Sequence, residues 1–273
     1  MRRLPTRLLL SLGLAAAPFL AWAEVPTPSP LPPADPVVPI SGSVSIGDAP
    51  VSDAPRLLRA VTDFSQGGGP GGHMEVRFSS FVSKASRGDT LSLRMRGDDL
   101  SMQMPGLPPL PAEEMQAIIR QTEVLATADK RTGKVTVQAK GTALLGPVGT
   151  SLEQFARVMA KAFFGGRTVR QGETILTYTG DDLGVGAPDQ RVTVSVTGKV
   201  TGRASAGGRD YVVINGGGPI SAANGAAGSV DFTAFIDRAT GLPAWSETNV
   251  SLDMGRQGGS MKMHQVDEIY LTN

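Results

Sequence analysis

The sequence predicts a mainly β protein: a curved antiparallel sheet or half-barrel with two or three α-helices packed on its concave face. Three observations predict this fold class. Apolar and polar residues alternate in many short runs between residues 74 and 263, as they do in strands with one buried face. The chain has 34 Gly and 20 Pro in 273 residues, which suits frequent turns. Only 19% of the residues are charged, which argues against a helical bundle.

The composition excludes several classes of protein. There is no Cys, so a disulfide scaffold, a thiol enzyme, a Cys-type zinc site and a lipid-modified Cys are ruled out. The formal net charge is +1, which is too small for a strongly basic nucleic-acid binder. We therefore expect no nucleic-acid partner.

Residues 1–23 are typical of an export signal. Three arginines precede an apolar run from Leu8 to Leu20, and the small residues at 21 and 23 predict cleavage between Ala23 and Glu24. The run is too short to span a bilayer, so we expect no stable membrane anchor after cleavage. The sequence thus predicts an exported protein, periplasmic or extracellular.

Residues 24–52 are predicted to form a Pro-rich linker. Seven prolines lie between positions 26 and 39, which favours an extended chain of the polyproline type without fixed structure. Residues 53–273 form the predicted β-rich domain.

Most of that domain consists of expected strands, about ten in all. The clearest alternating runs are Met74–Phe78, Leu91–Met95, Leu100–Met104, Val135–Val137, Val192–Val196 and Met261–Met263. Segments 173–179, 209–215, 229–236 and 244–254 are expected as further strands.

Three segments are predicted helices. In 53–64, Asp53 is a capping residue and four apolar residues recur at helical spacing. In 111–121, two acidic residues occupy the first turn, where the helix dipole favours them. In 151–164, Ser151 and Gln154 form a capping box and Gly165 ends the helix.

Three short patterns occur twice. Gly88-Asp89-Thr90 with Gly97-Asp98-Asp99-Leu100 is echoed at 172–174 and 180–183; Asp129-x-x-Thr132-Gly133 is echoed at 237–241; and Thr132-Gly133-Lys134-Val135-Thr136 is echoed at 197–201. Turn chemistry is common to them. An internal duplication and the independent recurrence of hairpin turns both explain the pattern.

The motifs that would carry chemistry favour turns over catalysis. Asp98-Asp99 and Asp181-Asp182 are interpreted as turn residues, because neighbouring strand residues point to opposite faces. Arg87-Gly88-Asp89 lies where a hairpin turn is expected, and the two Gly-Lys pairs lack the rest of a P-loop. Neither histidine lies in a catalytic motif. We therefore expect no enzyme activity and no cofactor.

The methionines are the sharpest feature. Pairs at 102 and 104 and at 261 and 263 share a strand face, and both histidines, His73 and His264, lie beside a Met. Thioethers suit Cu(I), but Met also fills adaptable apolar surfaces. The alternation of Met with Leu favours an apolar wall, and the candidate ligand-lining residues are Leu91, Leu93, Met95, Leu100, Met102 and Met104.

The order of helix, antiparallel run, inserted helices and closing strands behind a signal resembles the periplasmic half-barrel proteins, namely the lipoprotein carrier and lipid-binding mycobacterial lipoproteins. Segments 170–174 and 237–243 are similar to patterns in exported families of unknown function. The resemblance implies lipid carriage, and it supplies no family site residue.

The leading hypothesis is therefore an exported, non-enzymatic binding protein whose partner is an apolar small molecule or a lipidated protein. Two alternatives stay open. One is a structural or interaction protein of the envelope that recruits a partner at a sheet edge. The other is a copper-binding module of Met and His.

Overall fold

The structure is a computed structural model that describes residues 36–48, 56–66, 71–84, 90–103, 112–129, 132, 134–145, 153, 156–157, 160, 164–180, 192–222, 225–253 and 259–270. The predicted signal with its cleavage site at Ala23 and Glu24 lies outside the described residues. So do the tripeptide at 87–89, Met104 and the Asp pair at 181–182.

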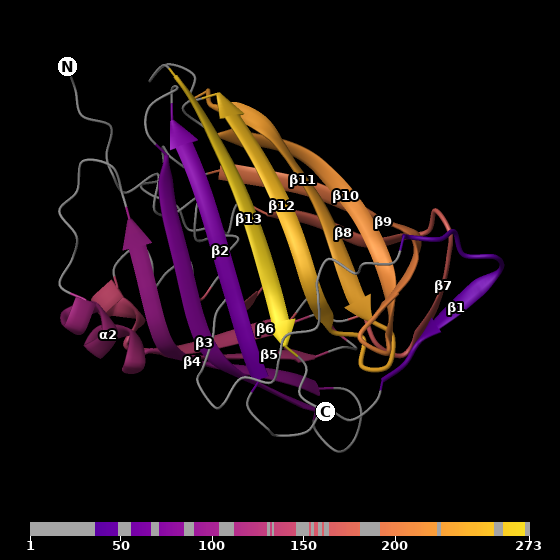
Figure 1. Cartoon of the computed structure of the whole chain (residues 1–273), viewed down its shortest axis with the longest axis horizontal. Helices are drawn as coiled ribbons and strands as arrows, with labels where there is room; N and C mark the ends of the chain where they lie inside the picture. The colour runs from indigo at the N-terminus through magenta and orange to yellow at the C-terminus, as the bar shows by residue number, and fades with distance from the viewer. Residues whose placement is uncertain are drawn as a thin grey trace.

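One antiparallel sheet of eleven strands forms most of the described chain, which confirms the mainly β class (Figure 1). Its spatial order is β6-β5-β4-β3-β2-β13-β12-β11-β10-β9-β8. The strands are β2 (Arg56–Gln66), β3 (Gly72–Lys84), β4 (Thr90–Gln103), β5 (Glu123–Asp129), β6 (Val135–Lys140), β8 (Thr174–Gly180), β9 (Val192–Ala206), β10 (Arg209–Ala222), β11 (Ala227–Asp237), β12 (Pro243–Asp253) and β13 (Ser260–Tyr270).

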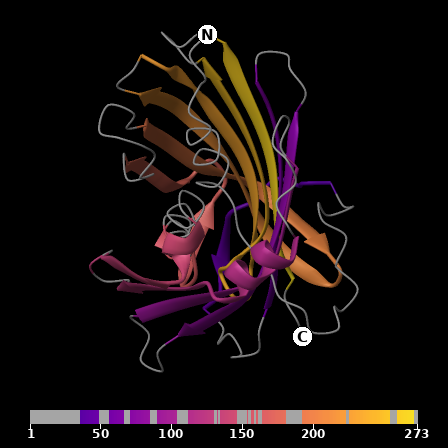
Figure 2. The same cartoon turned by 90° about the vertical axis from the view of Figure 1, so that its left-hand side faces the viewer.

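The sheet is two meanders joined where the first long strand meets the last. On one side of the join, strands β2 to β6 lie side by side in the order of the chain. On the other side, strands β8 to β13 do the same, with β13 next to β2. The join is the β2–β13 ladder, in which Leu57 pairs with Tyr270 and Gln66 with Met261. The sheet curves strongly, and its edge strands β6 and β8 do not pair with each other, so it forms an open half-barrel (Figure 2).

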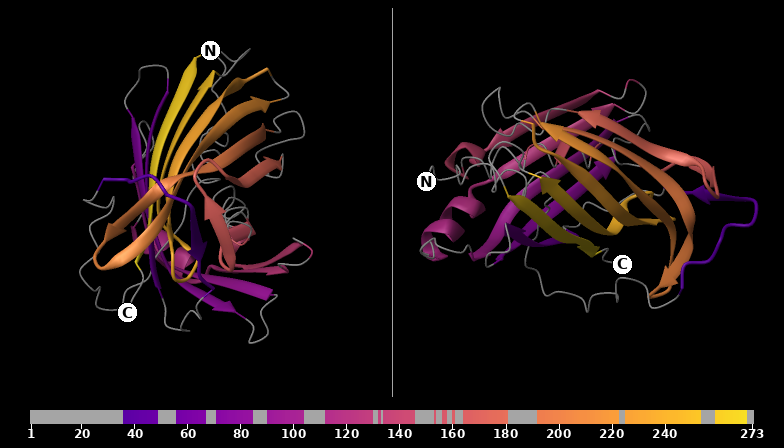
Figure 3. Two further views of the ribbon diagram at one scale, coloured as in Figure 1. Left: turned by 90° about the vertical axis from the view of Figure 1, so that its right-hand side faces the viewer. Right: turned by 90° about the horizontal axis from the view of Figure 1, so that it is seen from above.

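A small second sheet covers one end of the large one. Strand β1 (Ser43–Ile46) pairs antiparallel with β7 (Arg167–Arg170), and both lie beside the ends of β9 and β10 (Figure 3). Ile46 and Val169 pack with Val200, Val212 and Ile236 of the large sheet. Thus the last part of the predicted linker, which includes β1, belongs to the folded structure.

Helix α2 (Ala112–Arg120) confirms the prediction for 111–121. It packs on β4 on the concave side of the sheet (Figure 2). Ile119 is fully buried there. The expectation of two or three helices is not confirmed, because α2 is the one α-helix whose bounds fall within the described residues. Of the predicted helix at 151–164, four residues are described as helical: 153, 156, 157 and 160.

The predicted helix at 53–64 is wrong. The segment forms β2, which pairs with β13 on one side and β3 on the other. The spacing of Leu57, Leu58, Val61 and Phe64 fits a helical face, but pairing on both sides satisfies the backbone groups of this strand from Arg56 onward. Tertiary context overrides a local pattern of this kind.

Two predicted turns have the same hydrogen bonds. At the β5–β6 turn, Asp129 Oδ1 accepts from Thr132 N at 3.0 Å, and at the β11–β12 turn Asp237 Oδ1 accepts from Thr240 N at 2.8 Å. Other parts of the echo are not turns. The copy at 197–201 lies inside β9, and Asp98-Asp99 lies inside β4.

No helix within the described ranges is long and apolar enough to span a bilayer.

Candidate functional site

The predicted wall begins on β4. Leu91, Leu93 and Met95 are buried, with exposed fractions of 2%, 5% and 0%. In register they face Ala128, Ala126 and Val124 of β5, which are buried as well. We call the sheet face that carries these residues the inner face, and the opposite one the outer face. Gly97 lies on the inner face and contacts α2, which places this face on the concave side.

A β-bulge in β4 explains why the apolar pattern changes from odd to even residue numbers. The register shifts between Arg77 and Phe78, where Phe78 pairs with Gly97 but Arg77 pairs with Asp99. Beyond the shift, Leu100 pairs with Val76 and Met102 with Met74. One extra residue in β4 thus places the even-numbered positions after the bulge on the same face as the odd-numbered positions before it. The side chains of Leu100 and Met102 and the whole of Met104 lie outside the described residues.

The inner face is also apolar in the second meander, on the far side of the join. Met263 of β13 pairs with Val250 of β12, which pairs with Val230 of β11. All three belong to one buried cluster, together with Val192, Ile220, Ala226, Leu252 and Met261. The apolar lining therefore occurs in both meanders, on β4 and β5 and on β11 to β13, and not on β4 alone.

The connection from β6 leads to β7 of the small sheet. It begins with the 3-10 turn η1 (Thr142–Leu145) and includes the buried Ala156 and Ala160. Arg157 Nη1 donates to the carbonyl oxygen of Val135 in edge strand β6 at 3.4 Å. At the other end, Phe164 packs in the cluster over β9 to β11. The described residues of the connection thus contact edge strand β6 near one end and the cluster over β9 to β11 at the other.

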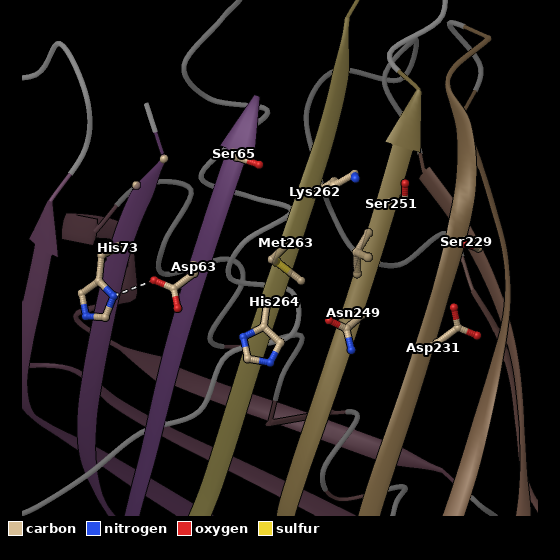
Figure 4. A pocket seen from close by; sticks show the side chains of 13 residues that line it. Asp63, Ser65, His73, Ser229, Asp231, Asn249, Ser251, Lys262, Met263 and His264 are labelled. Atoms are coloured by element: carbon tan, nitrogen blue, oxygen red, sulfur yellow. Dashed lines mark hydrogen bonds and ion pairs between the residues drawn. The ribbon is translucent and has the colours of Figure 1, made fainter. Parts of the chain in front are cut away.

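A second candidate is an open depression of about 650 Å³ on the outer face (Figure 4). A cross-strand row of polar residues crosses it, in which each residue is the register partner of the next: His73, Asp63, His264, Asn249 and Asp231. His73 Nδ1 lies 2.8 Å from Asp63 Oδ1, and His264 Nε2 lies 3.0 Å from Glu247 Oε1. The side chains of both pairs are about half-exposed, and ion pairs of this kind contribute little stability.

His264 and Met263, one of the two His-Met neighbours on which the copper alternative rests, do not share a site. His264 lies on the outer face, whereas its neighbour Met263 is buried on the inner face. The two side chains therefore cannot share a metal ion. Within the part of the chain that the structure describes, no group of three His, Asp or Glu side chains is placed to hold a metal.

A charged network flanks the depression on the outer face. Glu75 accepts hydrogen bonds from Arg59 and Arg77, and Arg59 also contacts Glu268 at 3.3 Å. Burial alone would raise the pKa of Glu75, but the two arginines outweigh it together and lower that pKa. This network ties β2, β3 and β13 together near the join.

The comparisons with known proteins add little to this geometry. No protein-family model matches the chain, and no curated protein matches it. Among solved structures, the chain is similar to a LolA superfamily protein from Nitrosomonas europaea. The identity is 6%, over 81% of this chain and 87% of that chain, and the TM-score is 0.19. This weak similarity agrees with the resemblance expected from the sequence.

Proposed function

We propose that the protein is an exported, non-enzymatic binding protein that holds an apolar ligand, or the acyl chain of a lipidated protein, against the inner face of its half-barrel. The observation that carries the proposal is an unclosed sheet whose inner face is apolar at the described positions of β4 and β5 and of β9 to β13. A soluble domain of this size needs no such open arrangement merely to bury a core. An open edge gives a ligand a route to the apolar face.

The chemistry of the lining suits an acyl chain. Leu, Val, Ala and Met side chains line the described inner face, and Met adapts to irregular shapes. Each buried methylene contributes about 0.8 kcal/mol. A chain of about twelve carbons contributes roughly 10 kcal/mol, and deducting at least about 4 kcal/mol for association leaves at most about 6 kcal/mol, which corresponds to a Kd of roughly 0.1 mM.

A fluorescence titration of the mature chain tests the proposal, with a neutral naphthylamine probe displaced by dodecanol. The informative variant is Ala126→Leu on the inner face of β5, with Thr136→Leu, exposed on neighbouring β6, as the matched control. If ligand space exists, Ala126→Leu weakens probe binding at an unchanged melting temperature and Thr136→Leu does neither. The proposal would be rejected if the wild-type protein bound no probe and Ala126→Leu lowered the melting temperature, because both results indicate a solid core.

Export is tested separately. Full-length chain expressed in a Gram-negative host should be recovered from the periplasmic or extracellular fraction with Glu24 as its first residue, by intact mass. Recovery of the uncleaved chain in the cytoplasm would reject this part of the proposal.

A further inference from the structure

Arg157 lies at the edge of the inner face and forms no ion pair with any described residue. Its one hydrogen bond within the described part of the chain is the 3.4 Å contact from Nη1 to the carbonyl oxygen of Val135. Its Nε is shielded from solvent and has no partner. Arginine stays protonated in proteins, so this charge persists through folding.

The acid best placed to neutralise Arg157 does not do so. Glu153 lies four residues earlier, where a helical pair would normally form, but its Oε1 accepts from Thr142 Oγ1 at 2.7 Å. Among the described residues, no carboxylate forms an ion pair with Arg157. A partly buried charge without a partner costs stability, and this cost suggests a role in binding.

The position of Arg157 relative to the wall is given by the sheet register. Val135, which accepts its hydrogen bond, pairs with Ala128 of β5, and Ala128 pairs with Leu91 of β4. Leu91 is the first residue of the candidate wall. Two strand spacings, roughly 10 Å, separate Leu91 from edge strand β6. Arg157 therefore stands where the apolar inner face meets the open edge.

We propose that Arg157 binds the anionic end, a carboxylate or a phosphate, of an amphipathic ligand whose apolar chain lies on the inner face. The inference rests on the proposed function and narrows its ligand class from apolar to amphipathic and anionic. A guanidinium offers two parallel N–H donors to either anion. Its place at the edge leaves the charged end of the ligand near water, while the chain lies against Leu91, Leu93 and Met95.

The test compares three twelve-carbon probes on the full mature chain: dodecanoate, dodecyl phosphate and dodecanol. We expect at least one anionic probe to bind about tenfold or more tightly than dodecanol, as a charge-assisted hydrogen bond allows. Arg157→Gln should bring anion affinity down to that of dodecanol and leave dodecanol binding unchanged, and Arg157→Lys should keep part of the preference. The better of the two anions identifies whether the headgroup is a carboxylate or a phosphate.

Lys140→Gln is the matched control, since it removes one positive charge from an exposed position on the same edge strand. It should leave all three affinities unchanged. Equal affinity of the wild-type protein for the three probes would overturn the inference and leave the proposed function standing. The inference would also be overturned if Arg157→Gln lowered the affinity for all three probes equally and lowered the melting temperature, because Arg157 would then have a structural role. Failure of all three probes to bind wild-type protein would reject the proposed function itself.

Discussion

A β-carbon added to Gly97 would lie 2.1 Å from the backbone carbonyl oxygen of Ile119. The last turn of α2 is therefore seated directly on β4, at the bulge that keeps the apolar residues on one face. Thr122, just after the helix, extends this contact, because its carbonyl oxygen accepts from Gly97 N at 3.0 Å. The residue at 97 must lack a side chain for the helix to approach so closely.

Gly97→Ala should destabilise the protein by at least about 2 kcal/mol, because the clash is with backbone and cannot be relieved by a side-chain rotation. Urea denaturation measures the change. Ser92→Ala in the same strand is the control and should alter stability by no more than about 0.5 kcal/mol. An unchanged urea midpoint for Gly97→Ala would show that α2 does not pack on β4 as described.

The two equivalent Asp turns should respond differently to the same substitution. Asp237 is 1% exposed, accepts from both Thr240 N and Thr240 Oγ1, and contacts Arg209 Nη1 at 3.4 Å. Asp129 makes the corresponding backbone contact at a half-buried position. We expect Asp237→Ala to cost about 3 kcal/mol, since it leaves the buried backbone N–H and hydroxyl of Thr240 without their acceptor and removes the contact with Arg209. Asp129→Ala should cost about 1 kcal/mol or less. Equal losses in calorimetry would contradict this burial difference.

Met263 and His264 are neighbours on opposite faces of β13, so alanine at each position tests the assignment of faces. Met263→Ala removes a side chain that is 4% exposed from an apolar cluster and should cost about 2–5 kcal/mol. His264→Ala removes only the half-exposed contact with Glu247 and should cost under about 1 kcal/mol. Chemical denaturation measures the loss of stability in each variant. A larger loss for His264→Ala than for Met263→Ala would place His264 in the core.

Stability should fall in acid partly because of Glu75. Its pKa in the folded protein is lowered from the ordinary value of 4.5, so folding favours its ionised form. The stabilisation is present above pH 4.5 and is lost as the pH falls through the lowered pKa. Glu75→Gln should therefore lower the melting temperature at pH 7 and make its decline below pH 4.5 shallower.

The control for Glu75 is Glu114→Gln, an exposed position in α2. Its melting temperature should follow that of the wild-type protein from pH 7 to pH 3. If Glu75→Gln follows the wild-type curve as well, the network with Arg59 and Arg77 does not stabilise the folded state.

The sequence predicted the sheet well because alternation is a local signal. Strand β5 and positions 260–266 of β13, for example, alternate residue by residue between buried and more exposed positions, and the pattern of Leu91, Leu93 and Met95 matches their burial. The same signal misled at β2, where apolar spacing imitates a helix. Alternation also does not explain why the apolar residues of β4 change from odd to even numbers, because the bulge is visible only in the register with β3.

The candidate site was predictable only in part. The apolar wall follows from alternation, but the sequence contained no sign that Arg157 lacks a partner, because Glu153 at helical spacing predicts a pair. The carboxylates beside His73 and His264 come from neighbouring strands, and their pairing depends on strand order. Each of these contacts joins residues whose proximity no local pattern encodes.

The sequence by itself determined the chemistry of each strand face, the Asp-x-x-Thr-Gly turns and helix α2, since these depend on residues close together along the chain. Only the tertiary structure decided that β2 is a strand, that it pairs with β13 some two hundred positions away, and that the sheet remains open between β6 and β8. The physical reason is that strands pair through backbone hydrogen bonds, which every residue type except proline can donate and accept. Side-chain patterns along one strand therefore do not determine which strand becomes its partner. That choice depends on all the strands of the folded chain.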